Sequence, residues 1–300
     1  MSLGVVIPAF NASRTLERAV RSAVAAGADN VVVVDDGSTD DTSSIAADLG
    51  CTVVRQENGG AASARRAGLA VVESEFTIML DADDELVARG CRLAMRRMAD
   101  LSVEHIAIVG MSIDFTPQGD ASPTRVWEEG ISVASMYGRG HSPAPPAAIV
   151  WRTEALKRVY LDDPPGLWPR YAEDYELLLR AVIVGKVSTL AEVVCRYSRV
   201  GGKSARHPER SIAAAQDIRA HYSNVSGATV GVLSSRLSVS LKLRKYSSLL
   251  SSPWQWPIRL GVLLLAAILD KYYRSTLLNR LASRIRFCKA RPTPKRGFHV

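Results

Sequence analysis

Cysteine is scarce in this chain, and its few cysteines are far apart. The four of them, Cys51, Cys91, Cys195 and Cys288, form no CxxC pair. We therefore expect neither a disulfide framework nor a zinc site, and a reducing, cytoplasmic environment fits this composition. Met1 is followed within two residues by the strand-like segment LGVVI, so we also expect no signal peptide ahead of the fold.

Long hydrophobic runs are missing, and so are acidic residues near the C-terminus. The apolar segment LGVLLLAAIL covers only residues 260–269, whereas a membrane-spanning helix needs about 20 apolar residues. Residues 242–300 contain 13 Lys and Arg and one acidic residue, while residues 1–241 contain 25 basic and 29 acidic residues. The net charge of +8 therefore combines a mildly acidic body with a tail of +12.

The first hundred residues alternate short apolar strands with helices. We predict strands at residues 3–7, 30–35, 51–54 and 76–80, and helices at residues 13–27, 40–49 and 61–73. This alternation indicates an α/β fold with a mostly parallel central sheet flanked by helices. Ligands bind outside the carboxyl ends of the strands in such sheets, so the loops that follow these strands are where we expect a site.

The rest of the chain is less regular. We predict strands at 104–115 and 147–151, a loop or lid at 116–130, and helices at 153–159 and 172–185. We divide the chain into a main domain, residues 1–210, and a helical, basic C-terminal extension, residues 211–300.

Four carboxylates crowd together in DADDE, directly after the strand at 76–80. They are Asp81, Asp83, Asp84 and Glu85, and like charges this close repel one another. A solvated turn whose aspartate caps the next helix would explain them. A site for a divalent cation and its anionic ligand would explain them equally well. The second acidic loop, DDGSTDDT after the strand at 30–35, is expected at the same sheet edge and strengthens the second interpretation.

A series of motifs in order along residues 3–200 resembles the family 2 inverting glycosyltransferases, which have the GT-A fold of nucleotide-diphospho-sugar transferases. They are VVIPAFNASRTLERAVRSA, VVVVDDGSTDDT, NGGAASARRAGL, FTIMLDADD and YAEDYELLLRA. The third departs from the family's pattern, because Arg66 stands where an Asn is usual. The Q-x-x-R-W motif of processive members is absent. The resemblance therefore implies transfer of a single sugar from a nucleotide-diphosphate donor to an acceptor hydroxyl. It also implies that residues 1–210 are the catalytic domain, with a nucleotide-binding half, residues 1–110, and an acceptor half, residues 111–210.

The resemblance also implies roles for particular residues. Asp83 would bind a cation, Mn²⁺ or Mg²⁺, while Asp81 would hold the ribose hydroxyls with help from the Ala82 backbone. Asp36 would accept a hydrogen bond from an N–H of the base, which favours a UDP-sugar and leaves a GDP-sugar open. The base would be lined by Pro8, Ala9 and Asn11, with Asn58 and Arg65 nearby.

Other residues keep two interpretations. Arg65 could contact the ligand or form an ion pair with Asp35 or Asp36. Asp174 would be the general base that removes the acceptor proton, and Glu173 would orient it or cap the helix. His207 could contact metal or phosphate, or be an exposed loop histidine.

The rival functions are a sugar nucleotidyltransferase and a non-catalytic, glycosyltransferase-like binding subunit. The first would normally carry a glycine-rich loop with Lys and Arg after the first strand, whereas PAFNASRT contains neither glycine nor lysine. Retention of Asp36, Asp81, Asp83 and Asp174 argues against the second. We expect a glycan or lipid-linked acceptor, made for cell-surface polysaccharide or glycolipid, and no nucleic acid as a partner.

The basic tail leads to a prediction about an anionic membrane surface. Each Lys or Arg near such a surface contributes about 1 kcal/mol of attraction, and burial of Trp254 and Trp256 would add to it. We expect the full-length chain to co-sediment with anionic vesicles at low salt and to be partly released at high salt. A chain truncated after Ser251 should lose vesicle binding but keep nucleotide binding.

Neutral vesicles serve as the control for this prediction, because they lack the charge that attracts the tail. A helix packed on the acidic body would use the same basic residues internally. In that case the truncated chain would unfold, and the full-length chain would co-sediment with neither anionic nor neutral vesicles.

Overall fold

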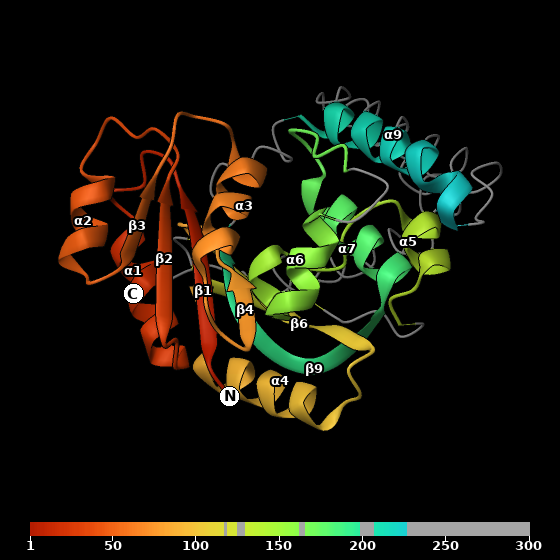
Figure 1. The fold of residues 1–300 in the computed structure, drawn as a ribbon, viewed down its shortest axis with the longest axis horizontal. Coiled ribbons are helices and arrows are strands. Elements are labelled where there is room, and N and C mark those ends of the chain that lie inside the picture. The colour runs from red at the N-terminus through yellow and green to blue at the C-terminus, as the bar shows by residue number, and fades with distance from the viewer. Residues whose placement is uncertain (117–118, 125–129, 162–165, 199–206, 227–300) are drawn as a thin grey trace, which may run out of the picture. The chain divides into compact units, whose positions relative to one another are not determined.

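The computed structural model describes residues 1–116, 119–124, 130–161, 166–198 and 207–226 (Figure 1). These residues belong to one compact unit, Met1–Thr229. The apolar segment at 260–269 and nearly all of the predicted C-terminal extension lie outside the described residues. The predicted division at residue 210 therefore stays a prediction.

The first part of the chain, up to Met79, has the predicted alternation of strands and helices. Strand β1 pairs in parallel with β2 and with β4, and β2 pairs in parallel with β3. The elements in chain order are β1 (Leu3–Ala9), α1 (Leu16–Ala26), β2 (Asn30–Asp35), α2 (Thr42–Asp48), β3 (Thr52–Arg55), α3 (Ala61–Val71) and β4 (Phe76–Met79).

The elements after β4 extend the same sheet and introduce antiparallel pairs. Strand β8 pairs antiparallel with β4 and with β6, while β6 and β9 run parallel. The elements are β5 (Glu85–Leu86), α4 (Ala88–Asp100), β6 (His105–Thr116), β7 (Gly119–Pro123), α5 (Val133–Arg139), the 3₁₀ helix η1 (Pro146–Ala148), β8 (Ile149–Arg152), α6 (Thr153–Leu161), α7 (Glu173–Val184), β9 (Lys186–Ser198) and α9 (Pro208–Ser226).

Across the described residues, the strand order is β3-β2-β1-β4-β8-β6-β9-β5, with β7 paired to β6. The sheet is thus mixed and mostly parallel, as the GT-A fold class predicts. Figure 1 shows the parallel strands β1 and β2 at one side and the long strands β6 and β9 continuing toward α5 and α7.

The acidic loop does not cap the helix that follows it. Helix α4 begins at Ala88, its N-cap is Val87, and no side chain caps it. Between the loop and the helix, Glu85 and Leu86 form the short strand β5, which pairs with Arg196 and Cys195 of β9. The capping interpretation was wrong, because backbone pairing to β9 takes up the residues that a longer helix would have used.

Three further elements were not predicted from the sequence. The predicted loop or lid at 116–130 contains β7, while α5 and the long strand β9 had no sequence-based counterpart. Strand β9 mixes polar and apolar residues, and its exposure along the strand does not alternate regularly. The register between β6 and β9 also shifts more than once, which removes the simple period-two signal of a strand.

The core lies where the apolar strands meet the helices that cover them. Val5 and Val6 of β1 and Val32 of β2 are fully buried, as are Leu16 and Ala19 of α1. Helix α1 ends as predicted at Gly27, whose φ of 92° is the left-handed conformation that glycine tolerates. Among the described residues, no helix is long and apolar enough to cross a membrane.

Gly68 gives a prediction about how closely α3 approaches the sheet. A Cβ at this position would lie 2.3 Å from Val6 Cγ1 and 3.0 Å from Val34 Cγ2. Alanine would gain about 1 kcal/mol of helix propensity, but overpacking a tight core typically costs about 1–3 kcal/mol. We expect Gly68→Ala to lower the free energy of unfolding, measured by urea denaturation.

The double variant Gly68→Ala with Val6→Ala tests the cause, because it removes the methyl group that the new Cβ would meet. The double variant should lose less free energy of unfolding than the two single variants lose together. Additive losses would show that the contact with Val6 is not what excludes a side chain at this position.

Candidate active site

The carboxyl ends of the parallel strands meet at one edge of the sheet. Ala9 is the register partner of Asp35, and Asp35 is that of Arg55. The backbone N–H of Asp36 donates to the Ala9 carbonyl over 2.8 Å. Pro8, Ala9 and Asp36, all predicted to contact the base, are therefore brought together.

Asn11 joins the loop after β1 to the loop after β2. Its backbone N–H donates to Ser38 Oγ over 2.9 Å, and its side-chain Oδ1 accepts from the Thr39 N–H over 2.9 Å. Asn11 has a φ of 51°, a left-handed conformation that asparagine adopts more easily than most residues. Its neighbour Phe10 exposes 52% of its surface, so an apolar ring stands open beside the predicted base site.

Asp36 is 4% exposed, and its carboxylate is held by three N–H donors. Oδ1 accepts from Gln56 Nε2 over 2.7 Å and from the Gly59 N–H over 2.8 Å, and Oδ2 accepts from the Gly60 N–H over 2.8 Å. Gln56 was missed in the sequence, although it directly follows β3 and the strand-end rule applies to it. The loop that carries these glycines also carries Asn58, whose side chain is exposed.

The DADD loop is held from one side by Arg18 of α1. Arg18 Nη2 donates to the Asp83 carbonyl over 3.1 Å, and Arg18 Nε lies 2.7 Å from Glu85 Oε1. The guanidinium also lies over the Phe115 ring, 5.2 Å from its centroid. These contacts tie the backbone of Asp83 to α1 and, through Phe115, to β6.

Asp84 lies inside the protein rather than at a helix end. It is fully buried, and Oδ1 accepts a 2.8 Å hydrogen bond from the Ser198 N–H at the end of β9. Oδ2 has no hydrogen-bond partner among the described residues. Burial, and then the nearby Asp81, raise the pKa of Asp84 to about 9. The hydrogen bond to Ser198 links the acidic loop to β9.

Asp83 is the carboxylate of the loop best suited to a cation. It is partly exposed, and its carboxylate is hydrogen-bonded to its own backbone N–H. Burial, and then the negative charge of Asp81, raise the pKa of Asp83. Both effects oppose ionisation in the bare protein, and a bound divalent cation would reverse them.

Arg65 connects the acidic loop to helix α7. It is 3% exposed, and its Nη2 lies 2.6 Å from Asp81 Oδ1 while Nη1 lies 3.5 Å from Glu173 Oε1. Burial lowers the pKa of Arg65, but the charges of Asp81 and Glu173 outweigh it and the net shift is upward. The guanidinium therefore stays charged.

The expected ion pair of Arg65 with Asp35 or Asp36 was wrong. Asp35 is held by other groups, since Arg55 Nε lies 3.2 Å from Oδ2 and the Ser38 N–H donates to Oδ1 over 2.8 Å. Glu173, expected to orient Asp174 or cap the helix, has Arg65 as its ion-pair partner.

Asp174 lies in the first turn of α7, next to Glu173. The helix starts after Ala172, whose φ of 60° is left-handed. Burial, and then repulsion from Glu173, raise the pKa of Asp174 to about 7. A carboxylate with such a pKa is suited to accept a proton at neutral pH, as a general base must.

His207 is half-buried rather than exposed, and it immediately precedes α9. Its ring meets the edge of Tyr171 at a centroid distance of 6.1 Å. In the part of the chain that the structure describes, no three or more His, Cys, Asp or Glu side chains are grouped to hold a metal ion by themselves.

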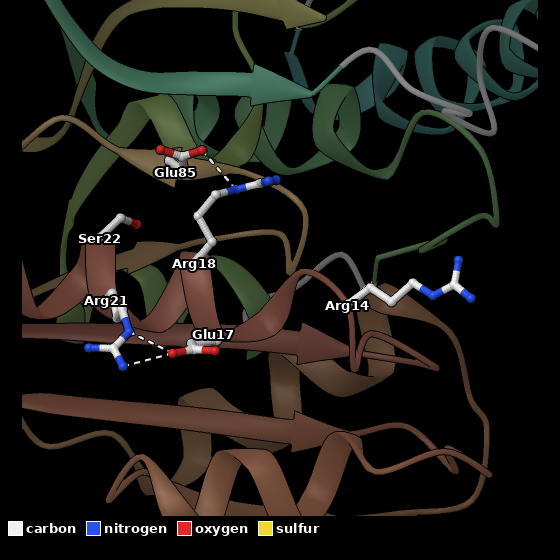
Figure 2. Close-up of a pocket in the computed structure, with 6 residues that line it drawn as sticks. All are labelled: Arg14, Glu17, Arg18, Arg21, Ser22 and Glu85. Carbon is white, nitrogen blue, oxygen red and sulfur yellow. Dashed lines mark hydrogen bonds and ion pairs between the residues drawn. The ribbon is translucent and has the colours of Figure 1, made fainter. Parts of the chain in front are cut away.

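A surface pocket of about 480 Å³ lies over α1, next to the acidic loop (Figure 2). It is lined by Arg14, Glu17, Arg18, Arg21, Ser22 and Glu85. Figure 2 shows Arg18 reaching Glu85 and Arg21 reaching Glu17, while Arg14 points away from the others. Since two of its arginines are already paired and none of the predicted donor residues lines it, we do not assign the nucleotide to this pocket.

A comparison with protein-family models decides the family. The model for glycosyl transferase family 2 matches residues 4–156, just over half of the chain. This chain belongs to glycosyl transferase family 2. It is therefore a glycosyltransferase, and the matched residues include all the predicted donor-site residues from Pro8 to Asp83.

Curated relatives support the same assignment. The glycosyltransferase is 26% identical over 231 residues to an uncharacterized glycosyltransferase of Nostoc sp., covering 73% of this chain and 71% of the relative. It is 34% identical over 197 residues to the succinoglycan biosynthesis protein ExoU of Rhizobium meliloti, covering 60% of this chain and 57% of ExoU.

Solved structures support the fold. The glycosyltransferase resembles residues 1–349 of TarS from S. aureus, solved in complex with UDP-GlcNAc, with a TM-score of 0.59 and 19% identity. The match covers 92% of this chain and 83% of that one. At this identity the likeness shows the shared GT-A fold.

The geometry of the acidic loop predicts the effect of removing one carboxylate. We expect Asp83→Ala to abolish sugar transfer and metal-dependent nucleotide binding, measured by titration calorimetry with UDP and Mn²⁺, while the circular dichroism spectrum stays unchanged. Asp84→Ala should lose less activity, because that carboxyl faces Ser198 and the interior. Normal turnover by the Asp83 variant would contradict the assignment of this residue as the metal ligand.

Proposed function

We propose that this glycosyltransferase transfers one sugar from a UDP-sugar to an acceptor hydroxyl, with inversion at the anomeric carbon. The observation that carries the proposal is the Arg65 bridge. It joins Asp81 of the donor loop to Glu173, the residue directly before Asp174, so donor groups and a carboxylate of suitable pKa are held in one site.

The donor side fits a uracil nucleotide. The carboxylate of Asp36 lies at the end of β2, beside Pro8 and Ala9, where the family resemblance expects an acceptor for a base N–H. Asp36 is already oriented by Gln56, Gly59 and Gly60, so binding would need little rearrangement. The complex of TarS with UDP-GlcNAc supports a UDP-sugar as the donor.

The residues at the acidic loop fit Mn²⁺ or Mg²⁺. Hard cations of this kind prefer oxygen ligands and are commonly held by one or two carboxylates together with substrate phosphates. The carboxylate of Asp83 is partly exposed, and a bound cation would relieve its repulsion with Asp81. Such a cation, when bound, would stabilise the negative charge that develops on the departing nucleotide diphosphate.

Asp174 would remove the proton from the attacking acceptor hydroxyl. The acceptor oxygen forms a bond to the anomeric carbon while the bond from that carbon to the phosphate oxygen breaks, and the nucleotide diphosphate leaves with the bonding electrons. The proton passes to the carboxylate of Asp174. Because this is a single displacement, the configuration at the anomeric carbon is inverted.

The acceptor would be a glycan or a lipid-linked glycan in the assembly of cell-surface polysaccharide or glycolipid. The similarity to ExoU, named for succinoglycan biosynthesis, supports a polysaccharide product. The basic tail supports work in the cytoplasm at an anionic membrane surface, with no nucleic acid as partner.

We expect Asp174→Asn to lower kcat by about 10²–10⁴-fold with little change in nucleotide affinity, because the amide keeps the shape but cannot accept a proton. In the wild type, kcat/KM should fall as the pH decreases through about 7, where Asp174 becomes protonated. The assay is release of UDP from a panel of UDP-sugars, with GDP- and dTDP-sugars alongside.

Stability gives an independent check with a definite sign. Folding raises the pKa of Asp174 from 3.8 to about 7. The ionised carboxylate therefore lowers the stability of the folded protein, with the full effect above pH 7 and no effect below pH 3.8. Asp174→Asn should therefore raise Tm at pH 8 and leave it unchanged near pH 3.5. Loss of nucleotide binding with survival of the rate on bound donor would contradict the proposed base.

The same panel separates the rival functions. Release of pyrophosphate from a sugar phosphate and a nucleoside triphosphate would identify a nucleotidyltransferase. Nucleotide binding without any turnover would identify a binding subunit.

A further inference from the structure

A buried carboxylate that the proposed reaction does not use lies two residues after Asp174. Glu176 is fully buried, and three donors hold it. Oε1 accepts from the Leu167 N–H over 2.6 Å and from the Tyr222 hydroxyl over 2.7 Å, and Oε2 accepts from the Trp168 N–H over 2.6 Å. Two of these bonds run to the backbone of the segment that leads into α7.

Glu176 does not compete with Asp174 for the role of base. Successive helix residues are about 100° apart around the axis, so side chains two positions apart point to different sides. The carboxylate of Glu176 is saturated by donors and sealed from solvent, so it has no access to an acceptor. Its effect on the reaction must pass through the groups that it binds.

The segment bound by Glu176, residues 166–172, has an unusual backbone. Trp168 and Ala172 have φ values of 43° and 60°, a left-handed conformation that non-glycine residues adopt only under constraint. Both residues precede the first turn of α7, where Asp174 lies. The position of that turn therefore depends on whatever holds this segment in place.

The side chain of Trp168 supplies a second anchor. Its ring stacks on Tyr160 at a centroid distance of 4.5 Å, and the guanidinium of Arg180 lies 5.4 Å from its centroid. Arg180 also donates to the Val159 carbonyl and to the Tyr222 hydroxyl. A Cβ on Gly166 would lie 2.2 Å from Trp168 Nε1, so a side chain at that position would force the Trp168 ring to shift.

We infer that Glu176 is a positioning residue for sugar transfer, because it holds residues 166–172 in the strained conformation that places Asp174. The inference rests on the proposed role of Asp174 as the base. Helix α9 adds the third hydrogen bond to this carboxylate through the hydroxyl of Tyr222.

Glu176→Gln tests this inference with Tyr222→Phe as the matched control. Glutamine has one acceptor oxygen, so at least one of the two amides, of Leu167 or Trp168, must lose its partner. Tyr222→Phe removes the third hydrogen bond and leaves both amides bound. Both variants disturb the same buried cluster, but only the first releases the segment.

The readouts are hydrogen exchange of residues 166–172, hydrolysis of UDP-GlcNAc and UDP-glucose with Mn²⁺, and binding of UDP. For Glu176→Gln we expect amide exchange to rise at least about 10-fold and kcat for hydrolysis to fall by up to about 100-fold, with KM and UDP affinity within about twofold. For Tyr222→Phe we expect exchange and kcat close to those of the wild type, even where Tm falls. Equal loss of kcat in the two variants would overturn the inference.

Gly166→Ala provides a second route should Glu176→Gln fail to fold. Its Cβ displaces the segment at Trp168 while the buried carboxylate stays intact, and the same loss of kcat is expected. Asp174→Asn, measured in parallel, keeps the two claims apart. If that variant hydrolyses donor normally, the proposed base is wrong. If it is inactive while both Glu176→Gln and Gly166→Ala are fully active, only the positioning role is wrong.

Discussion

A single buried positive charge, the guanidinium of Arg65, holds the two sides of the site together. It lies between a carboxylate of the donor loop and one at the start of α7, and both partners belong to segments distant in sequence. Because the guanidinium is buried, removing either carboxylate would leave its charge less fully compensated and lower the stability of the fold. Neither half of the site can therefore rearrange without the other.

The donor side is organised before any ligand binds. Asn11 ties the first two strand-end loops together, and Asp36 is clamped by the loop that follows β3. Two hydrogen bonds hold the acidic loop, one from Arg18 to the Asp83 carbonyl and one from the Ser198 N–H to Asp84. Because these bonds are intramolecular, little conformational entropy remains to be lost when the nucleotide arrives.

The sequence was most informative where local pattern and tertiary structure agree. The parallel half could be predicted closely because its strands are uniformly apolar and each is followed by an amphipathic helix with recognisable ends, such as Gly27. Strands β5, β7 and β9 could not, because their residues pair with distant strands and carry no periodic signal. The motif residues at the ends of these strands could be expected in one region, because the carboxyl ends of parallel strands lie at the same edge of the sheet.

Side-chain partners were harder to predict than positions. The pairing of Arg65 was assigned to the wrong acidic residues because the sequence contains several carboxylates at the same sheet edge, and only the packing of α7 decides among them. Asp84 was expected at a helix end, but the two-residue strand β5 moved the helix away. Glu176 drew no attention, because a glutamate in a helical pattern gives no sign that its side chain turns inward.

The order of these elements along the chain has a consequence for engineering. Every predicted donor contact lies between Pro8 and Asp83, and the segment that we propose to position the base begins at residue 166, so the donor and acceptor sides of the proposed site occupy separate stretches of one polypeptide. A chimera could therefore exchange the second stretch between family members and keep the donor preference of the first. The join would succeed best where the incoming α7 offers a carboxylate at the position of Glu173, since otherwise the buried Arg65 would keep only Asp81 as a counterion.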